Sequence, residues 1–154
     1  MTFDEKMNRI CGITDFYLSR FGRTQIGIFH LPITDPNPCC FPIFINTLMV
    51  TLRRKNFMPY NFWVRDADAG GFILILWASG YFRNDLSDIT PVVQRFWACH
   101  SPGPVVELGS FSLSTESPAE ALFLFRKTVG DHLIPKQPIP GTWHQRTFGG
   151  SQIR

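Results

Sequence analysis

The sequence lacks any apolar run of the roughly 18 residues that a membrane-spanning helix requires. Its first residues, MTFDEKMNRICG, include acids and lack the basic-then-apolar order of a signal peptide. Charged residues are also scarce, at 18%, while hydrophobic residues make up 44%. This composition excludes an intrinsically disordered chain, and 154 residues are enough to bury a core. We expect one folded domain in the cytoplasm, with no membrane partner.

Cysteine motifs are absent as well. The four cysteines follow no Cys-x-x-Cys spacing. Adjacent Cys39 and Cys40 are poorly placed to hold one tetrahedral ion by themselves, and a cytosolic protein keeps its thiols reduced. We therefore interpret these two, together with Cys11 and Cys99, as buried or incidental thiols. We expect no metal and no cofactor.

Aromatic residues, in contrast, are abundant. They make up 14% of the chain and include 15 Phe and 4 Trp. Such a chain is expected to fold around an aromatic core and to keep some apolar surface for a partner. The net charge of +3, with a pI of about 8.8, permits contact with nucleic acid without requiring it.

Hydrophobic periodicity in the first half predicts a helix, a strand and a second helix. Residues 24–33 read as a strand that Pro32 ends, and residues 41–55 as an amphipathic helix with a basic last turn, which suits the helix dipole. The first helix, over 3–21, has one apolar stripe. The residues of that stripe are Phe3, Met7, Ile10, Tyr17, Leu18 and Phe21.

The second half begins with two strands, 61–66 and 72–77, joined by a turn at 67–71. A further helix is predicted over 86–97 and a further strand over 104–113.

The stretch SPAE predicts the start of a last helix. Ser117 is its expected N-cap, Pro118 its first helical residue, and Glu120 completes a capping box. We expect that helix to run to about Val129. The proline- and glycine-rich residues 130–154 are predicted to form an extended C-terminal arm.

After the first helix, the order is strand, helix, strand, strand, helix, strand, followed by another helix. This is the order of the split β-α-β, ferredoxin-like fold, in which two helices pack on one face of an antiparallel sheet. We predict an α+β fold of this kind and a single domain over residues 1–154.

Three segments carry a resemblance to a known family. The segments are PYNFWVRD (59–66), GYFRNDLSDITPVVQRFWA (80–98) and RTFGGSQ (146–152). In their order and spacing they resemble the inovirus-type replication-protein family of filamentous phages, cryptic prophages and phage satellites. The family is related to the His-hydrophobe-His replication initiators. The resemblance implies a replication-initiator-like scaffold in a bacterial host cell.

The chain departs from the family where its enzymes carry out chemistry. In active members, the strand after the Trp-Val-Arg motif holds a divalent cation with two histidines flanking one hydrophobic residue. The corresponding stretch here is GGFILIL (70–76), and an acid of an early strand corresponds to His30. The nucleophilic tyrosine is expected about three residues before Lys127, where Phe123, Leu124 and Phe125 stand instead. We therefore expect a protein that is not an enzyme.

Other residues that could support chemistry are scattered. The four histidines lie in four segments, so each is interpreted as an ordinary hydrogen-bonding residue. They are His30, His100, His132 and His144. Asp66 and Asp68 flank a turn, where aspartate usually bonds the local backbone. The tyrosines at 17, 60 and 81 are outside the helix on which the family's nucleophile is expected.

A set of basic residues and one tryptophan forms the tentative surface for nucleic acid or a partner. These residues are Arg53, Arg54, Lys55, Arg65, Arg83, Arg126, Lys127, Arg146 and Trp143. Phosphate contacts would give salt-sensitive, non-specific binding, and aromatic side chains stack on bases or anchor protein interfaces. Scattered, solvated surface charge is the equally simple alternative.

The sequence therefore leads to three hypotheses of function. The first is a non-catalytic, replication-initiator-like protein of a phage or phage satellite that binds a phage or host protein and so redirects phage replication or packaging. The second is a DNA-binding replication accessory or regulator. The third is an active single-strand nicking endonuclease with a rebuilt site, which the absence of a metal ligand in 70–76 disfavours.

Overall fold

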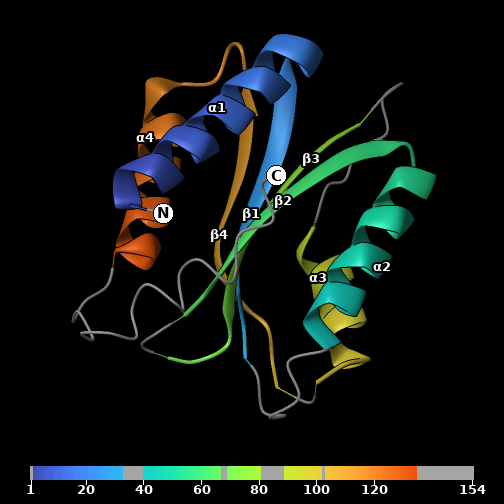
Figure 1. Ribbon diagram of the computed structural model, residues 1–154. Coiled ribbons are helices and arrows are strands. Elements are labelled where there is room, and N and C mark those ends of the chain that lie inside the picture. The colour runs from blue at the N-terminus through green and yellow to red at the C-terminus, as the bar shows by residue number, and fades with distance from the viewer. Residues whose placement is uncertain (1, 33–39, 67–68, 81–88, 102, 135–154) are drawn as a thin grey trace.

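The computed structural model describes residues 2–32, 40–66, 69–80, 89–101 and 103–134. Four helices and four strands lie in these ranges (Figure 1). They are α1 (Phe3–Phe21), β1 (Arg23–Leu31), α2 (Cys40–Arg54), β2 (Phe57–Arg65), β3 (Phe72–Gly80), α3 (Thr90–Ala98), β4 (Val106–Ser114) and α4 (Ala119–Leu133). The order of helices and strands is the one that the sequence predicts.

The four strands form one antiparallel sheet in the order β2-β3-β1-β4. Strand β3 therefore lies between β1 and β2, which the chain joins through α2. This is the split β-α-β arrangement, and the prediction of an α+β, ferredoxin-like fold is confirmed. Strands β2 and β4 are the edges, and β2 contains Pro59 in its first half.

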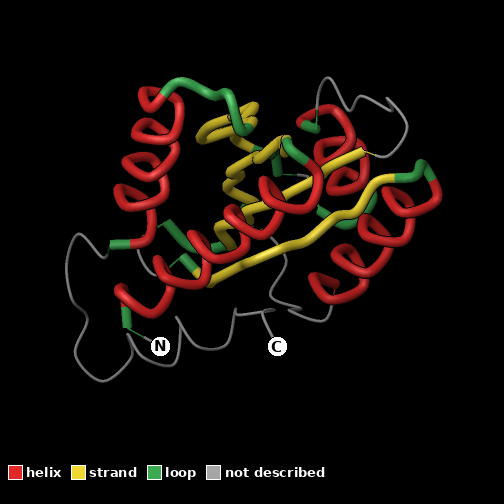
Figure 2. Tube along the Cα trace, turned by 90° about the horizontal axis from the view of Figure 1, so that it is seen from above, coloured by secondary structure: helices red, strands yellow, loops and turns green. Residues whose placement is uncertain are grey.

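Helices cover both faces of the sheet. Helices α2 and α3 lie on one face, as predicted, and α1 and α4 lie on the other (Figures 1 and 2). The sequence of β3 explains the second layer, because this strand is apolar on both sides. Leu74 and Leu76 pack toward α2 and α3, whereas Ile73, Ile75 and Trp77 pack toward α1 and α4.

Two hydrogen bonds attach α1 to the sheet, one of them fully buried. Trp77 Nε1 donates to Thr14 Oγ1 at 3.0 Å, and this hydroxyl donates in turn to Ile10 O at 2.8 Å. The Tyr17 hydroxyl donates to Met58 O at 2.7 Å, which ties α1 to edge strand β2. The helix is therefore held against both a central and an edge strand.

The hairpin of β2 and β3 is longer than the sequence predicts. Its register pairs Phe57 with Gly80 at one end and Arg65 with Phe72 at the other. The turn uses positive φ at Gly70 and Gly71, which glycine adopts without strain. Residues 67 and 68 lie outside the described residues.

The predicted start of the last helix is wrong. Helix α4 begins at Ala119 with Pro118 as its N-cap, and no side chain caps it. The Ser117 hydroxyl instead accepts a hydrogen bond from the Ser114 amide, within the turn after β4. The helix also runs beyond Val129 to Leu133, because both of these residues are buried against the sheet. Residues 130–133 are thus helical, and residues 135–154 of the expected arm lie outside the described residues.

Helix α3 is shorter in the described residues than the predicted 86–97, since it begins at Thr90 and residues 86–88 lie outside them. Ile89, Val93 and Trp97 are buried. Among the described helices, none has both the length and the apolar character needed to cross a membrane.

Candidate functional site

The stretch 70–76, where the resemblance predicts the metal ligands of active enzymes, includes the first half of β3, which lies between β2 and β1 in the sheet. Two residues that flank one hydrophobic residue on a strand share a face. On β3 the residues Ile73 and Ile75 do so, and their side chains are 3% and 0% exposed against α1 and α4. These positions are part of the core.

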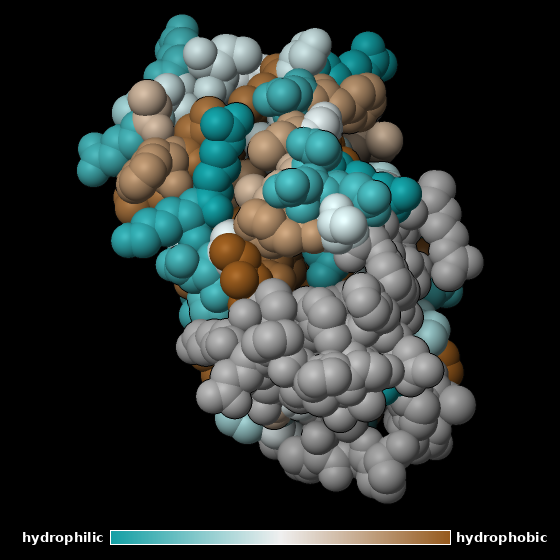
Figure 3. Space-filling view, turned by 60° about the vertical axis from the view of Figure 1, so that its left-hand side comes forward, coloured by the Kyte–Doolittle hydropathy of each residue, from teal (hydrophilic) through white to brown (hydrophobic). Residues whose placement is uncertain are grey.

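The expected place of the nucleophile is on α4. Phe125 is 1% exposed and packs edge-on against Phe111 of β4, with ring centroids 5.4 Å apart. Phe123 and Leu124 point outward and are 65% and 46% exposed. On the side of the molecule formed by α1 and α4, exposed hydrophobic residues lie between hydrophilic ones (Figure 3). Lys127 is exposed as well.

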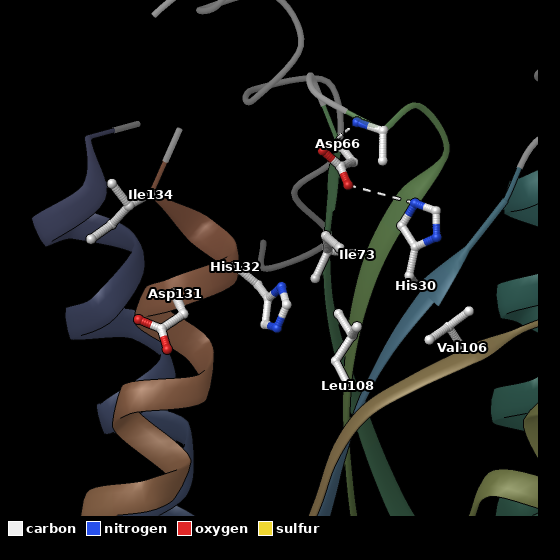
Figure 4. A pocket seen from close by; sticks show the side chains of 9 residues that line it. His30, Asp66, Ile73, Val106, Leu108, Asp131, His132 and Ile134 are labelled. Atoms are coloured by element: carbon white, nitrogen blue, oxygen red, sulfur yellow. Dashed lines mark hydrogen bonds and ion pairs between the residues drawn. The ribbon is translucent and has the colours of Figure 1, made fainter. Parts of the chain in front are cut away.

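A pocket of about 260 Å³ lies beside Ile73, between the turn of the hairpin, strands β1 and β4, and the last turn of α4 (Figure 4). Its walls combine apolar side chains with four groups that can titrate. These four groups are His30, Asp66, Asp131 and His132. We call it the His30 pocket.

His30 is held by the hairpin turn. Its Nε2 is 2.7 Å from Gly70 O and 3.5 Å from Asp66 Oδ2. Because a carbonyl oxygen only accepts, Nε2 carries a proton and donates it to Gly70 O. The other oxygen of Asp66 accepts from the Ala69 amide at 3.2 Å. The interpretations of His30 as a hydrogen-bonding residue and of Asp66 as a turn residue are confirmed.

His132 lies on the opposite wall of the pocket, on the last turn of α4, and its ring points toward the strands (Figure 4). The sequence interpretation did not bring His30 and His132 together, because nothing in their spacing shows that α4 ends beside the start of the hairpin turn. Within the part of the chain that the structure describes, no group of three or more His, Cys, Asp or Glu side chains is arranged to hold a metal ion.

The basic residues of the tentative surface lie in three places. Arg53 and Arg54 are in the last turn of α2, and Lys55 follows directly; all three are exposed. Arg65 lies at the far end of β2, a strand that rises about 26 Å from Phe57 to Arg65. Its guanidinium packs 5.5 Å from the ring centroid of Phe72.

The remaining basic residues are elsewhere. Arg126 and Lys127 belong to α4, in the helix layer on the other face of the sheet from α2. Arg83, Arg146 and Trp143 lie outside the described residues. The described members of the set therefore form separate patches and not one stripe.

The cysteines and tyrosines that the structure describes form no reactive cluster. Cys11 is half-buried and Cys99 exposed, both as free thiols, which is consistent with the interpretation of these two as incidental thiols. The side chains of Cys39 and Cys40 lie outside the described part. Tyr17 is buried and bonded to Met58 O.

A second hollow was missed by the sequence interpretation. It has a volume of about 520 Å³ and lies between α1, the first half of β2 and the end of α2. Its lining residues are Arg9, Gly12, Ile13, Phe16, Tyr17, Arg53, Met58, Pro59 and Tyr60, and we call it the α1–β2 groove. One signal was available: Phe16 is a large apolar residue outside the predicted helical stripe, and it is 61% exposed.

No protein-family model matches the chain, and comparisons with curated proteins and with solved structures give no match either. Function is therefore argued from the residues of this protein.

Proposed function

We propose that the protein acts by binding, as a non-catalytic, replication-initiator-like protein of a phage or phage satellite whose partner is a phage or host protein. One observation carries this proposal. Within the stretch 70–76, where the resemblance predicts metal ligands, Ile73 and Ile75 are buried, and Phe125, beside the predicted place of the nucleophile, belongs to the same buried cluster.

These buried positions contribute to the stability of the fold. A metal ligand must present a lone pair to an open site, whereas a core side chain contributes by leaving water. Ile75 and Phe125 are at most 1% exposed. A scaffold with such a core, and with exposed hydrophobic residues on its surface, is suited to association with another molecule.

A second candidate is a DNA-binding replication accessory or regulator. The observation in its favour is the run of exposed cations at the end of α2, Arg53 to Lys55. Three adjacent cations reach few phosphates, so this surface alone would bind DNA weakly and without sequence preference.

The experiment is recovery of the tagged, full-length protein from phage-infected cells, with and without nuclease treatment. We expect one phage or host protein to remain bound in stoichiometric amount after nuclease, and to bind again when both proteins are purified. A variant with the Glu116→Gln substitution, which removes one exposed charge in the turn before α4, serves as a control and should retain the same protein partner as the wild type.

Recovery of nucleic acid alone would contradict the proposal and favour the second candidate. Cleavage of single-stranded DNA that depends on magnesium or manganese, and that a Tyr60→Phe or Tyr81→Phe substitution abolishes, would show the nicking activity of the third hypothesis.

A further inference from the structure

The α1–β2 groove is lined by exposed apolar side chains together with basic ones. Phe16 and Met58, which line it, are 61% and 42% exposed. Arg53 and Arg9 line it as well, and no acidic residue is among the described residues that line the groove. The groove therefore complements a segment that combines an apolar side chain with carboxylates.

The walls of the groove are already held in place. Tyr17 is 4% exposed, and its hydroxyl spans from α1 to Met58 O of β2 at 2.7 Å. Next to it on α1, Phe16 packs edge-on against the Tyr17 ring, with centroids 5.9 Å apart. A site whose walls are fixed before binding loses little conformational entropy when it is occupied.

The groove is accessible because it lies across an edge of the sheet. Among the described strands, β2 pairs only with β3, and the groove is lined by residues from helices that cover opposite faces. Figures 1 and 2 show α1 and α2 on either side of this edge. A partner segment thus reaches the groove without displacing any strand.

We propose that the α1–β2 groove is the docking site for an acidic segment of a partner protein. One aromatic or aliphatic side chain of that segment packs against Phe16 and Met58, and a carboxylate of the segment pairs with the guanidinium group of Arg53. This inference rests on the proposed function and names its site. A polyanionic nucleic acid fits less well, because a groove lined mostly by apolar side chains neutralises few phosphates.

The experiment selects binders from a random-peptide display library on the immobilised full-length protein and measures their affinity by fluorescence anisotropy. We expect enriched peptides to combine Asp or Glu with an aromatic or aliphatic residue. Their affinity should fall about tenfold or more for Arg53→Glu and for Phe16→Ala, because a charged contact and an apolar anchor are lost.

The matched control is Arg95→Glu, which makes the same change of charge at an exposed position on α3, away from the groove. This variant should bind the selected peptides as tightly as the wild type. Both groove substitutions replace exposed side chains, so circular dichroism should show unchanged folding for all three variants.

Three results would overturn the inference. They are enrichment of peptides without acidic residues, equal affinity of the wild type and both groove variants, and a groove that binds a labelled oligothymidine but no acidic peptide. The failure of the inference is distinguishable from the failure of the proposed function. If the Arg53→Glu and Phe16→Ala variants retain the nuclease-resistant protein partner of the wild type, the partner binds elsewhere and only the docking site is wrong.

Discussion

The two ends of strand β2 present opposite chemistry. At its start, Met58 and Tyr60 border the α1–β2 groove, which is lined by apolar side chains and by guanidinium groups. Just past its end, Asp66 borders the His30 pocket, where two carboxylates and two imidazoles gather around an apolar wall. The same edge strand thus leads from a cationic site to a site with acidic side chains.

The two sites differ in how far the protein's own groups already occupy their side chains. In the His30 pocket, the imidazole of His30 already bonds the Gly70 carbonyl and faces Asp66, so groups of the protein itself saturate this wall. In the groove, Phe16 and Met58 remain largely in contact with water. Apolar surface in water gains free energy when a partner covers it, so the groove is the end with more to gain from binding.

The largest expected loss of stability comes from placing a histidine in β3, the strand that borders the His30 pocket at Ile73. Ile75→His buries an imidazole in a core position that is 0% exposed, which should lower the free energy of unfolding by about 3 to 5 kcal/mol. Ile73→His, beside the pocket, should cost about 2 kcal/mol, because its ring reaches an open space. Urea unfolding of both variants measures the difference, and equal costs would contradict this view of β3.

The next prediction concerns Lys6, a cation of α1 that is buried, unlike the exposed arginine at the groove, Arg53. Lys6 is 2% exposed, and its burial lowers the pKa of its amine from 10.5 to about 8. Below pH 8 the folded protein therefore carries a buried charge that the unfolded chain keeps in water. This penalty decreases as pH rises from about 8 to 10.5, where only the unfolded chain still holds the proton.

Lys6→Met removes that penalty, so this variant should be more stable than the wild type at pH 7. Its advantage should shrink by about 2 kcal/mol between pH 7 and pH 10, as the wild type loses the buried charge. Urea unfolding at the two pH values measures the advantage. An advantage that does not change with pH would show that burial does not lower the pKa of this amine.

A smaller effect tests how firmly the groove is built. Tyr17→Phe removes the hydroxyl that binds Met58 O and should lower the free energy of unfolding by about 1 kcal/mol. Hydrogen exchange of the β2 amides near Met58 should become faster in this variant, whereas the amides near Arg65 should be unaffected. Uniform acceleration along β2 would show that the two ends of the strand are not independent.

The smallest effect is expected at the His30 pocket. Asp66→Asn removes the charge that faces His30 at 3.5 Å but keeps an oxygen for the Ala69 amide. The cost should be below about 1 kcal/mol and should vanish at high salt, because the pair is partly exposed. Unfolding at low and high ionic strength measures it, and a larger cost that resists salt would indicate a more deeply desolvated pair.

The order of elements could be predicted from the sequence because periodicity is a local property. The apolar run of β3 and the stripe of α1 each identified an element from the spacing of its own residues. The start of α4 was predicted wrongly for a physical reason: the Ser117 hydroxyl has an alternative partner, the Ser114 amide, which depends on how β4 ends.

The candidate sites could not be predicted in the same way. His30 and His132 share a pocket only because the end of α4 lies beside the hairpin turn, and that placement follows from packing and register. The α1–β2 groove likewise joins residues far apart in the sequence, Phe16 and Met58. Its one local trace was an aromatic residue that does not fit the stripe of its own helix.

Pro59 has a consequence for how copies of this protein behave at high concentration. It stands in the first half of edge strand β2 and has no amide proton to offer. An open edge with an unbroken ladder invites neighbouring molecules to stack strand on strand into fibrils, and a proline there interrupts this growth. The edge that leaves the groove accessible is thereby also protected from indiscriminate self-assembly.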